Sequence, residues 1–92
     1  MQTFNVGDLV QFIPENFDDI TWSYRYEGVG YIEEITDWSV KTNSIKGLKV
    51  YKIFCGKIIR QQMKNFAEIE LKDIVLEFTD KDMQKVCKKL NK

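Results

Sequence analysis

The sequence predicts a mainly β domain, a small five-stranded barrel followed by a short amphipathic helix at the C-terminus. Short apolar runs rich in Val, Ile, Phe and Tyr recur along the chain, and turn-forming residues separate them. Two of these runs begin at glycines, Gly7 and Gly28, and glycines of this kind allow the sharp bends that a small barrel needs. The pattern changes to a helical period only after Thr79.

The first two strands are predicted at residues 6–13 and 28–36. Their apolar members are mostly β-branched or aromatic, and Pro14 ends the first strand because proline lacks a backbone donor. Two closely spaced glycines at the start of the second strand favour a bulge or a bend. A dinucleotide-binding loop is the alternative, but Glu33 stands where that fingerprint needs its third glycine.

A long connection, residues 14–27, separates these two strands. Its first half is acidic. Its second half alternates in polarity, so Trp22, Tyr24 and Tyr26 share one face of an extended chain. These aromatic side chains either cover the barrel core or form a binding surface, since Tyr and Trp are favoured at interfaces.

The remaining strands are predicted from apolar alternation at residues 48–54, 57–63, 68–71 and 73–78. Residues 41–47 are expected to form a hairpin loop, and Cys55 and Gly56 a tight turn. In the tail, residues 80–90 are predicted to be helical, with one apolar stripe made by Met83, Val86, Cys87 and Leu90. A helix this short must dock, either as a plug in an open end of the barrel or against a partner.

Size and composition set the class of protein. The 92 residues predict a single domain, 1–92, with the barrel over 5–78 and the helix over 79–91. The 14 basic and 14 acidic residues cancel, which weighs against a general polyanion binder. We expect a cytoplasmic protein with no membrane partner, because no apolar run approaches the ~20 residues that cross a bilayer and no signal peptide is recognisable. The two cysteines are expected to be free thiols.

Four short motifs resemble those of SH3-like small β-barrels, including the KOW and Tudor groups. They are GDLV at 7–10, GVGYI at 28–32, YKI at 51–53 and DIVL at 73–76. The resemblance covers residues 5–78. It implies a fold and a binding module for peptides, RNA or DNA, without choosing among these ligands.

Catalytic chemistry is not expected. The chain has no histidine, which removes the commonest general base and metal ligand. Cys55 has Lys57 nearby but no base partner, and Cys87 lies on the helix stripe, where a core position is expected. We therefore predict that the protein is not an enzyme and that it uses no catalytic residue, metal, cofactor or small-molecule substrate.

The preferred functional prediction is a non-enzymatic binding module for another protein, acting as an inhibitor or adaptor. The acidic aromatic connection would supply the anchors and the steering charge, through Asp18, Asp19, Trp22, Tyr24 and Tyr26. The frequent Lys, Ile and Asn would suit a low-GC bacterium or its phage.

Nucleic-acid binding is the alternative prediction. Residues 1–40 contain eight acids and one base, whereas residues 41–92 contain thirteen bases and six acids. The basic 41–64 hairpin interleaves lysines with aromatic residues, as single-stranded nucleic acid requires, and the candidate contacts are Lys49, Tyr51, Lys52, Lys57 and Arg60. If the two halves interleave in one sheet, these charges would instead mix on its surface.

Overall fold

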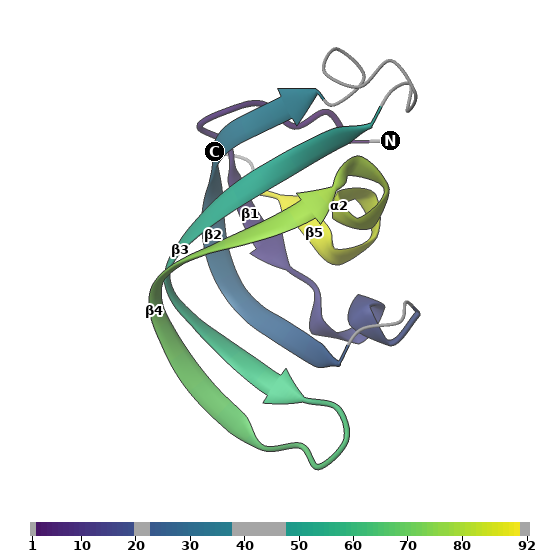
Figure 1. Ribbon diagram of the computed structural model, residues 1–92, viewed down its shortest axis with the longest axis vertical. Coiled ribbons are helices and arrows are strands. Elements are labelled where there is room, and N and C mark those ends of the chain that lie inside the picture. The colour runs from purple at the N-terminus through teal and green to yellow at the C-terminus, as the bar shows by residue number, and fades with distance from the viewer. Residues whose placement is uncertain (1, 20–22, 38–47, 91–92) are drawn as a thin grey trace.

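The computed structural model describes residues 2–19, 23–37 and 48–90, which form one strongly curved antiparallel sheet (Figure 1). The strands are β1 (Leu9–Phe12), β2 (Tyr24–Asp37), β3 (Lys49–Gln62), β4 (Glu68–Thr79) and β5 (Cys87–Lys89). A 3-10 helix, η1 (Pro14–Asp19), precedes β2, and an α-helix, α2 (Asp80–Val86), precedes β5. The strand order is β4-β3-β2-β1-β5. The predicted mainly β class with five strands and a short helix near the C-terminus is confirmed.

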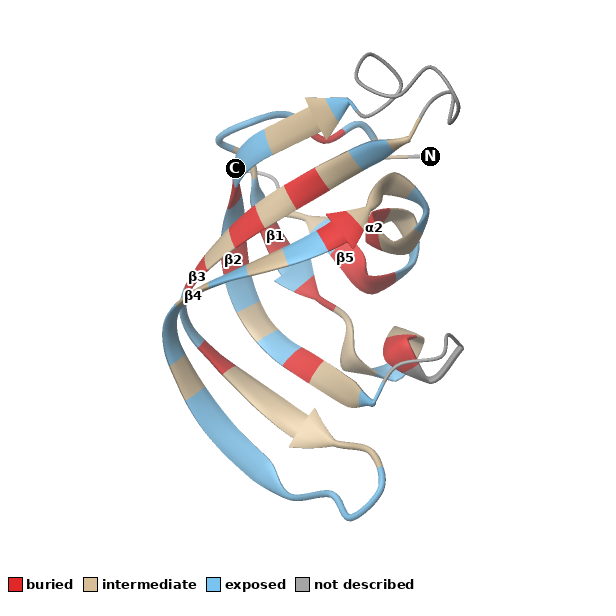
Figure 2. Cartoon of the chain, viewed as in Figure 1, coloured by how far each residue is buried: buried red, intermediate tan, exposed pale blue. Residues whose placement is uncertain are grey.

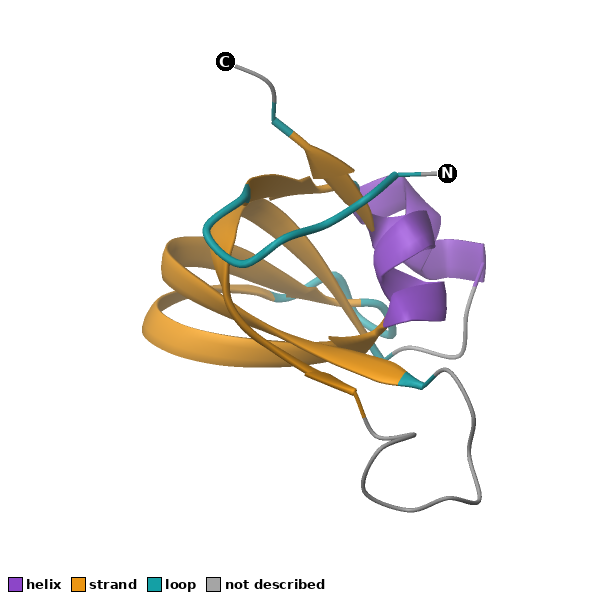
Figure 3. Ribbon diagram, turned by 90° about the horizontal axis from the view of Figure 1, so that it is seen from above, coloured by secondary structure: helices purple, strands orange, loops and turns teal. Residues whose placement is uncertain are grey.

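The predicted barrel is not confirmed, because the sheet is open. Among the described strands, β4 and β5 are the two edges and do not pair with each other. β5 has only three residues, and all of them pair with β1. The chain passes from one edge to the other through α2, which lies against the inner side of the sheet (Figures 1 and 3).

The predicted turn at Cys55 and Gly56 is wrong, because both residues lie inside β3. Three β3 residues, 55–57, stand opposite two β2 residues, 29–30, and this bulge bends the strand without reversing it. The predicted strands 48–54 and 57–63 are therefore one strand. The bend that the glycines of β2 predict is confirmed at this register shift.

The two predicted strands 68–71 and 73–78 also form one strand, β4. Asp73 joins them with a left-handed backbone, φ 51°, at the position opposite the bulge in β3. Aspartate tolerates this conformation better than most residues. The sheet consequently bends through β3 and β4 at the same level (Figure 1).

Two further boundaries differ from prediction. The long connection is shorter than expected, because η1 occupies part of it and β2 already begins at Tyr24. The helix ends at Val86, four residues before the predicted end. Cys87 is extended, with φ −124° and ψ 146°. It starts β5, which provides hydrogen-bond partners for the backbone of β1.

The core lies on the inner face of the sheet, under η1 and α2 (Figure 2). Phe17 of η1 packs against Phe12, Tyr26 and Phe78, with ring centroids 5.7–6.4 Å apart. Met83 and Val86 are fully buried, so the predicted docking of the helix is confirmed. Within the described part of the chain, no helix is long and apolar enough to span a membrane.

Candidate functional site

The outer face of the sheet has a row of apolar side chains that runs across four strands. Cross-strand pairing places Leu9 beside Tyr31, Tyr31 beside Phe54, and Phe54 beside Val75. Directly paired residues point to the same side of a sheet. The buried residues of these strands point inward, so the four residues, hereafter the outer apolar row, face outward.

The outer apolar row is substantially exposed. Leu9 is 42%, Tyr31 41% and Val75 45% exposed, and Val29 beside them is 41% exposed. The rings of Tyr31 and Phe54 contact each other, with centroids 5.7 Å apart. Phe54, the fourth member of the row, is partly buried. A contiguous exposed apolar surface of this kind marks an interaction site more often than isolated exposed residues do.

Ion pairs border the row on both sides. On one side, Lys52 Nζ lies 3.2 Å from Glu34 Oε1, and the pKa of Lys52 is raised because Glu34 hydrogen-bonds and attracts its charged form. On the other side, Lys57 Nζ lies 3.2 Å from Glu70 Oε2. An apolar centre with a polar rim is the usual anatomy of a protein interface.

The residues predicted for protein binding are not gathered into one exposed surface. Tyr26 is only 8% exposed and belongs to the core, as the core alternative for the aromatic residues expects. Tyr24 is half-buried and lies under Arg60. Asp18 and Asp19 end η1, and Trp22 lies outside the described residues.

The residues predicted for nucleic-acid binding are divided between the two faces. Alternation along β3 places Lys52 and Lys57 outside, paired with glutamates, and Arg60 inside. Tyr51 is 3% exposed, and its hydroxyl donates to Asp80 Oδ1 at 2.8 Å. β3 lies between two strands that bear acids, so the charges of the two halves mix, and the predicted basic surface is not continuous.

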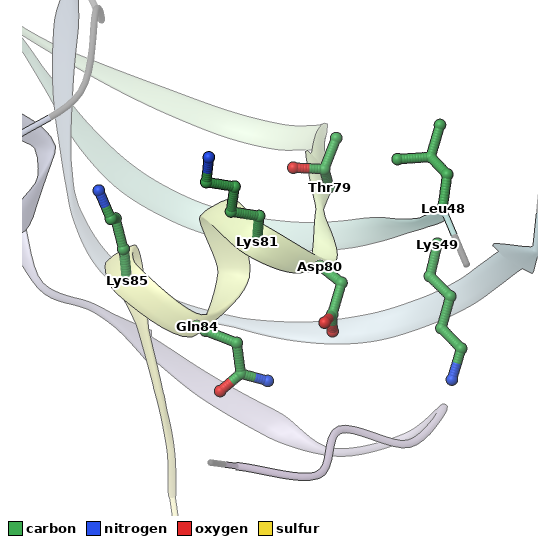
Figure 4. Close-up of a pocket in the computed structure, with 7 residues that line it drawn as sticks. All are labelled: Leu48, Lys49, Thr79, Asp80, Lys81, Gln84 and Lys85. Atoms are coloured by element: carbon green, nitrogen blue, oxygen red, sulfur yellow. The ribbon is translucent and has the colours of Figure 1, made fainter. Parts of the chain in front are cut away.

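A hollow with a volume of about 700 Å³ lies between the start of β3 and α2 (Figure 4). Its lining residues are Leu48, Lys49, Thr79, Asp80, Lys81, Gln84 and Lys85. The amines of Lys81 and Lys85 point away from that of Lys49 (Figure 4), so these cations do not converge on one ligand position. Leu48 directly follows residues 38–47, which lie outside the described part of the chain.

Both cysteines are free and fully buried. Burial raises the pKa of Cys55 to about 11. Burial, with a smaller effect from the neighbouring Cys55 charge, raises the pKa of Cys87 to about 12. Both thiols are therefore protonated at neutral pH, the opposite of what a nucleophile needs. The predicted core position of Cys87 is confirmed.

Sequence reasoning missed the outer apolar row, although part of the signal was available. Tyr31 and Val75 are apolar residues of predicted strands, and Asp73 and Glu77, two positions to either side of Val75, mark its face as the polar one. Only the strand register shows that these residues, separated by more than 40 positions, lie on either side of Phe54 in one row. Comparison of the chain with protein families, with characterised proteins and with solved structures finds no match.

Proposed function

We propose that this protein is a non-enzymatic protein-binding module and that the outer apolar row is its contact surface. The carrying observation is the register that aligns three exposed apolar residues and the partly buried Phe54 across β1 to β4. An aromatic pair lies at its centre, and tyrosine is a favoured interface anchor. The protein-binding role predicted from the sequence is therefore proposed again, but the proposed contact surface is the outer apolar row and not the connection before β2.

The row offers a partner exposed apolar side chains without requiring the fold to open. Its members lie on hydrogen-bonded strands, so their positions are set by the sheet before binding, which reduces the ordering cost of association. The ion-paired rim would favour a partner surface that is apolar at its centre and charged at its edge.

We also propose that the sheet is an open form of an SH3-like small barrel. The placement of β1 between β2 and β5, and the helical turn between β4 and β5, support this proposal. A cytoplasmic location likewise stays a proposal from the sequence.

An affinity capture with matched variants tests the proposed function. The immobilised protein is exposed to lysates of low-GC bacteria, with and without nuclease treatment. The double variant Tyr31→Ser, Val75→Ser removes the centre and one end of the row. The control Val6→Ser, Phe66→Ser removes two side chains that are 60% and 65% exposed but lie outside the row.

We expect a nuclease-resistant protein partner to be retained by the wild type and by the control, and lost with the row variant. Both variants should keep the wild-type urea midpoint, because surface substitutions usually change stability by less than about 0.5 kcal/mol. Capture that disappears after nuclease treatment, or equal capture by both variants, would contradict the proposal.

A further inference from the structure

A small hollow lies on the inner face of the β3–β4 hairpin, on the opposite side of the sheet from the outer apolar row. Its volume is about 120 Å³, and its lining residues are Tyr24, Arg60, Gln62, Ala67 and Ile69. Arg60 pairs with Tyr26 on one side and Ile69 on the other. Because Tyr26 belongs to the core, these paired side chains share the inner face.

The guanidinium of Arg60 is held in place by an aromatic ring. Its Cζ atom lies 4.3 Å from the ring centroid of Tyr24. Stacking of this kind restrains the plane of the guanidinium and leaves donors at its edge available for a ligand. The Nε atom is buried and has no hydrogen-bond acceptor. A cation that is partly desolvated and incompletely bonded would gain from an anionic acceptor.

The acids of the adjacent strands face the other side of the sheet. Glu27 and Glu70 both pair with Ile59, and Glu68 pairs with Gln61, whose Nε2 donates to it at 3.3 Å. Residues 59 and 61 flank Arg60 and therefore point to the opposite face. Among the side chains that the structure describes, Arg60 makes no ion pair.

We propose that this hollow, hereafter the Arg60 hollow, binds a carboxylate group. The planar guanidinium presents paired N–H donors that match the two oxygens of a carboxylate. The apolar walls, formed by the Tyr24 ring, Ala67 and Ile69, suit the carbon chain that bears the carboxylate. Among the described lining residues Arg60 is the single cation, and one positive charge balances a carboxylate better than the greater charge of a phosphate.

NMR titration of the ¹⁵N-labelled protein tests this inference at constant ionic strength. The probes are sodium acetate, its neutral isostere acetamide, and inorganic phosphate. Acetate should produce saturable shift changes at the backbone amides of Arg60, Gln62 and Ile69, whereas acetamide and phosphate should not. Equal responses to acetate and acetamide, or to acetate and phosphate, would overturn the assignment of a carboxylate site.

Two further probes distinguish the source of the carboxylate. Blocked aspartate, N-acetyl-aspartate N-methylamide, represents an acidic side chain, and N-acetylglycine represents a chain terminus. Saturable binding of either supports the inference, and the tighter one identifies the source. Binding of neither at concentrations where free acetate saturates would overturn recognition of a peptide carboxylate and leave acetate as an adventitious ion only.

Matched variants separate the guanidinium from general charge. Arg60→Gln should weaken acetate binding by at least about tenfold because it removes the charged donor pair. Lys64→Gln, an exposed cation of the same hairpin outside the lining, should leave the affinity unchanged. An equal loss of acetate affinity in both variants would show that the net charge alone determines binding, and it would overturn the proposed site.

Two more variants guard against unfolding and against an internal ligand. The spectrum of each variant reports its fold directly. If Arg60→Gln does not fold, Tyr24→Leu keeps the arginine but removes the stack, and it should also weaken acetate binding. Asp18→Asn, Asp19→Asn should leave acetate affinity unchanged; tighter binding would mean that an acid of η1 already occupies the hollow and would overturn an external ligand. This test is independent of the outer apolar row, so either proposal can fail alone.

Discussion

Gly30 lies in β2 at the bulge, where the strand passes close to β3. A Cβ atom at this position would stand 2.6 Å from Ile53 Cγ2 and 2.8 Å from the Phe54 carbonyl oxygen. Both separations are shorter than van der Waals contact, and the second atom belongs to the backbone, which cannot rotate away. The glycine is thus required by space at the bulge between the two strands.

Gly30→Ala should therefore destabilise the protein by about 1–3 kcal/mol, the usual cost of forcing extra volume into a packed core. Gly56→Ala is the matched control, because a Cβ atom there meets nothing within 4 Å. Urea denaturation of both variants measures the difference. Equal midpoints would show that β2 and β3 can separate at the bulge without cost.

Tyr51 connects the middle of the sheet to the first turn of α2. Burial and the hydrogen bond to Asp80 raise its pKa to about 12 from an ordinary value of 10.0. The folded state therefore holds the phenolic proton more tightly than the unfolded state does. This contribution to stability is complete below pH 10 and is lost as the pH rises toward 12.

The free energy of unfolding should accordingly fall between pH 10 and 12, with a contribution from Tyr51 of at most about 1.4 kcal/mol per pH unit. Tyr51→Phe should remove that contribution to the pH dependence and the last step of the tyrosinate absorbance titration. Tyr31→Phe, on the exposed outer face, is the control and should keep both. An unchanged titration of Tyr51→Phe would contradict the assignment.

At the scale of elements, α2 connects the two edges of the sheet. Thr79 caps its N-terminus by accepting a hydrogen bond from the Asp82 amide. The helix ends at Val86. Val86 and the next residue, Cys87, are both buried, and two consecutive residues of a helix do not readily point toward the same sheet. The chain then extends into β5, and the Leu90 amide donates to the Leu9 carbonyl at 3.0 Å.

Met83 is the central contact of α2 with the core. Met83→Ala should destabilise the protein by about 2–5 kcal/mol, because it removes a fully buried side chain and leaves a cavity. Lys81→Ala, exposed on the same helix, should change stability by less than about 0.5 kcal/mol. Thermal and urea denaturation measure both. A small effect of Met83→Ala would mean that the core under α2 refills the space.

At the scale of the whole molecule, β3 belongs to the basic second half of the sequence and lies between β2, which comes from the acidic first half, and β4. Its lysines pair with Glu34 of β2 and Glu70 of β4. The charge asymmetry along the sequence is thus largely balanced across the sheet. What remains distinctive on the surface is apolar: the outer apolar row, and the exposed Ile69 beside the Arg60 hollow.

The two thiols report on the whole fold, since both are fully buried and have raised pKa values. Native protein should react with a thiol reagent at the rate of unfolding, and both cysteines should react together. Ser23→Cys, which adds an exposed thiol directly before β2, should react at once at the new position. Rapid labelling of Cys55 or Cys87 in the native protein would show that the core opens locally.

The sequence by itself determined the class of the fold, most strand segments, the helix start at Thr79 and the bend at the glycines of β2. These features depend on neighbouring residues, through polarity alternation, capping and backbone freedom. Alternation also marked Tyr24 and Tyr26 as sharing a face, and they do share the inner one.

Only the tertiary structure decided whether the sheet closes, where β3 continues and which side chains meet. Gly56 suits a turn or a bulge equally well locally, and the neighbouring strands select the bulge. Likewise, no local pattern shows that Tyr31 and Val75 belong to one row, or that Arg60 stacks on Tyr24. Strand register joins residues far apart in the chain, and it is set by the packing of the whole core.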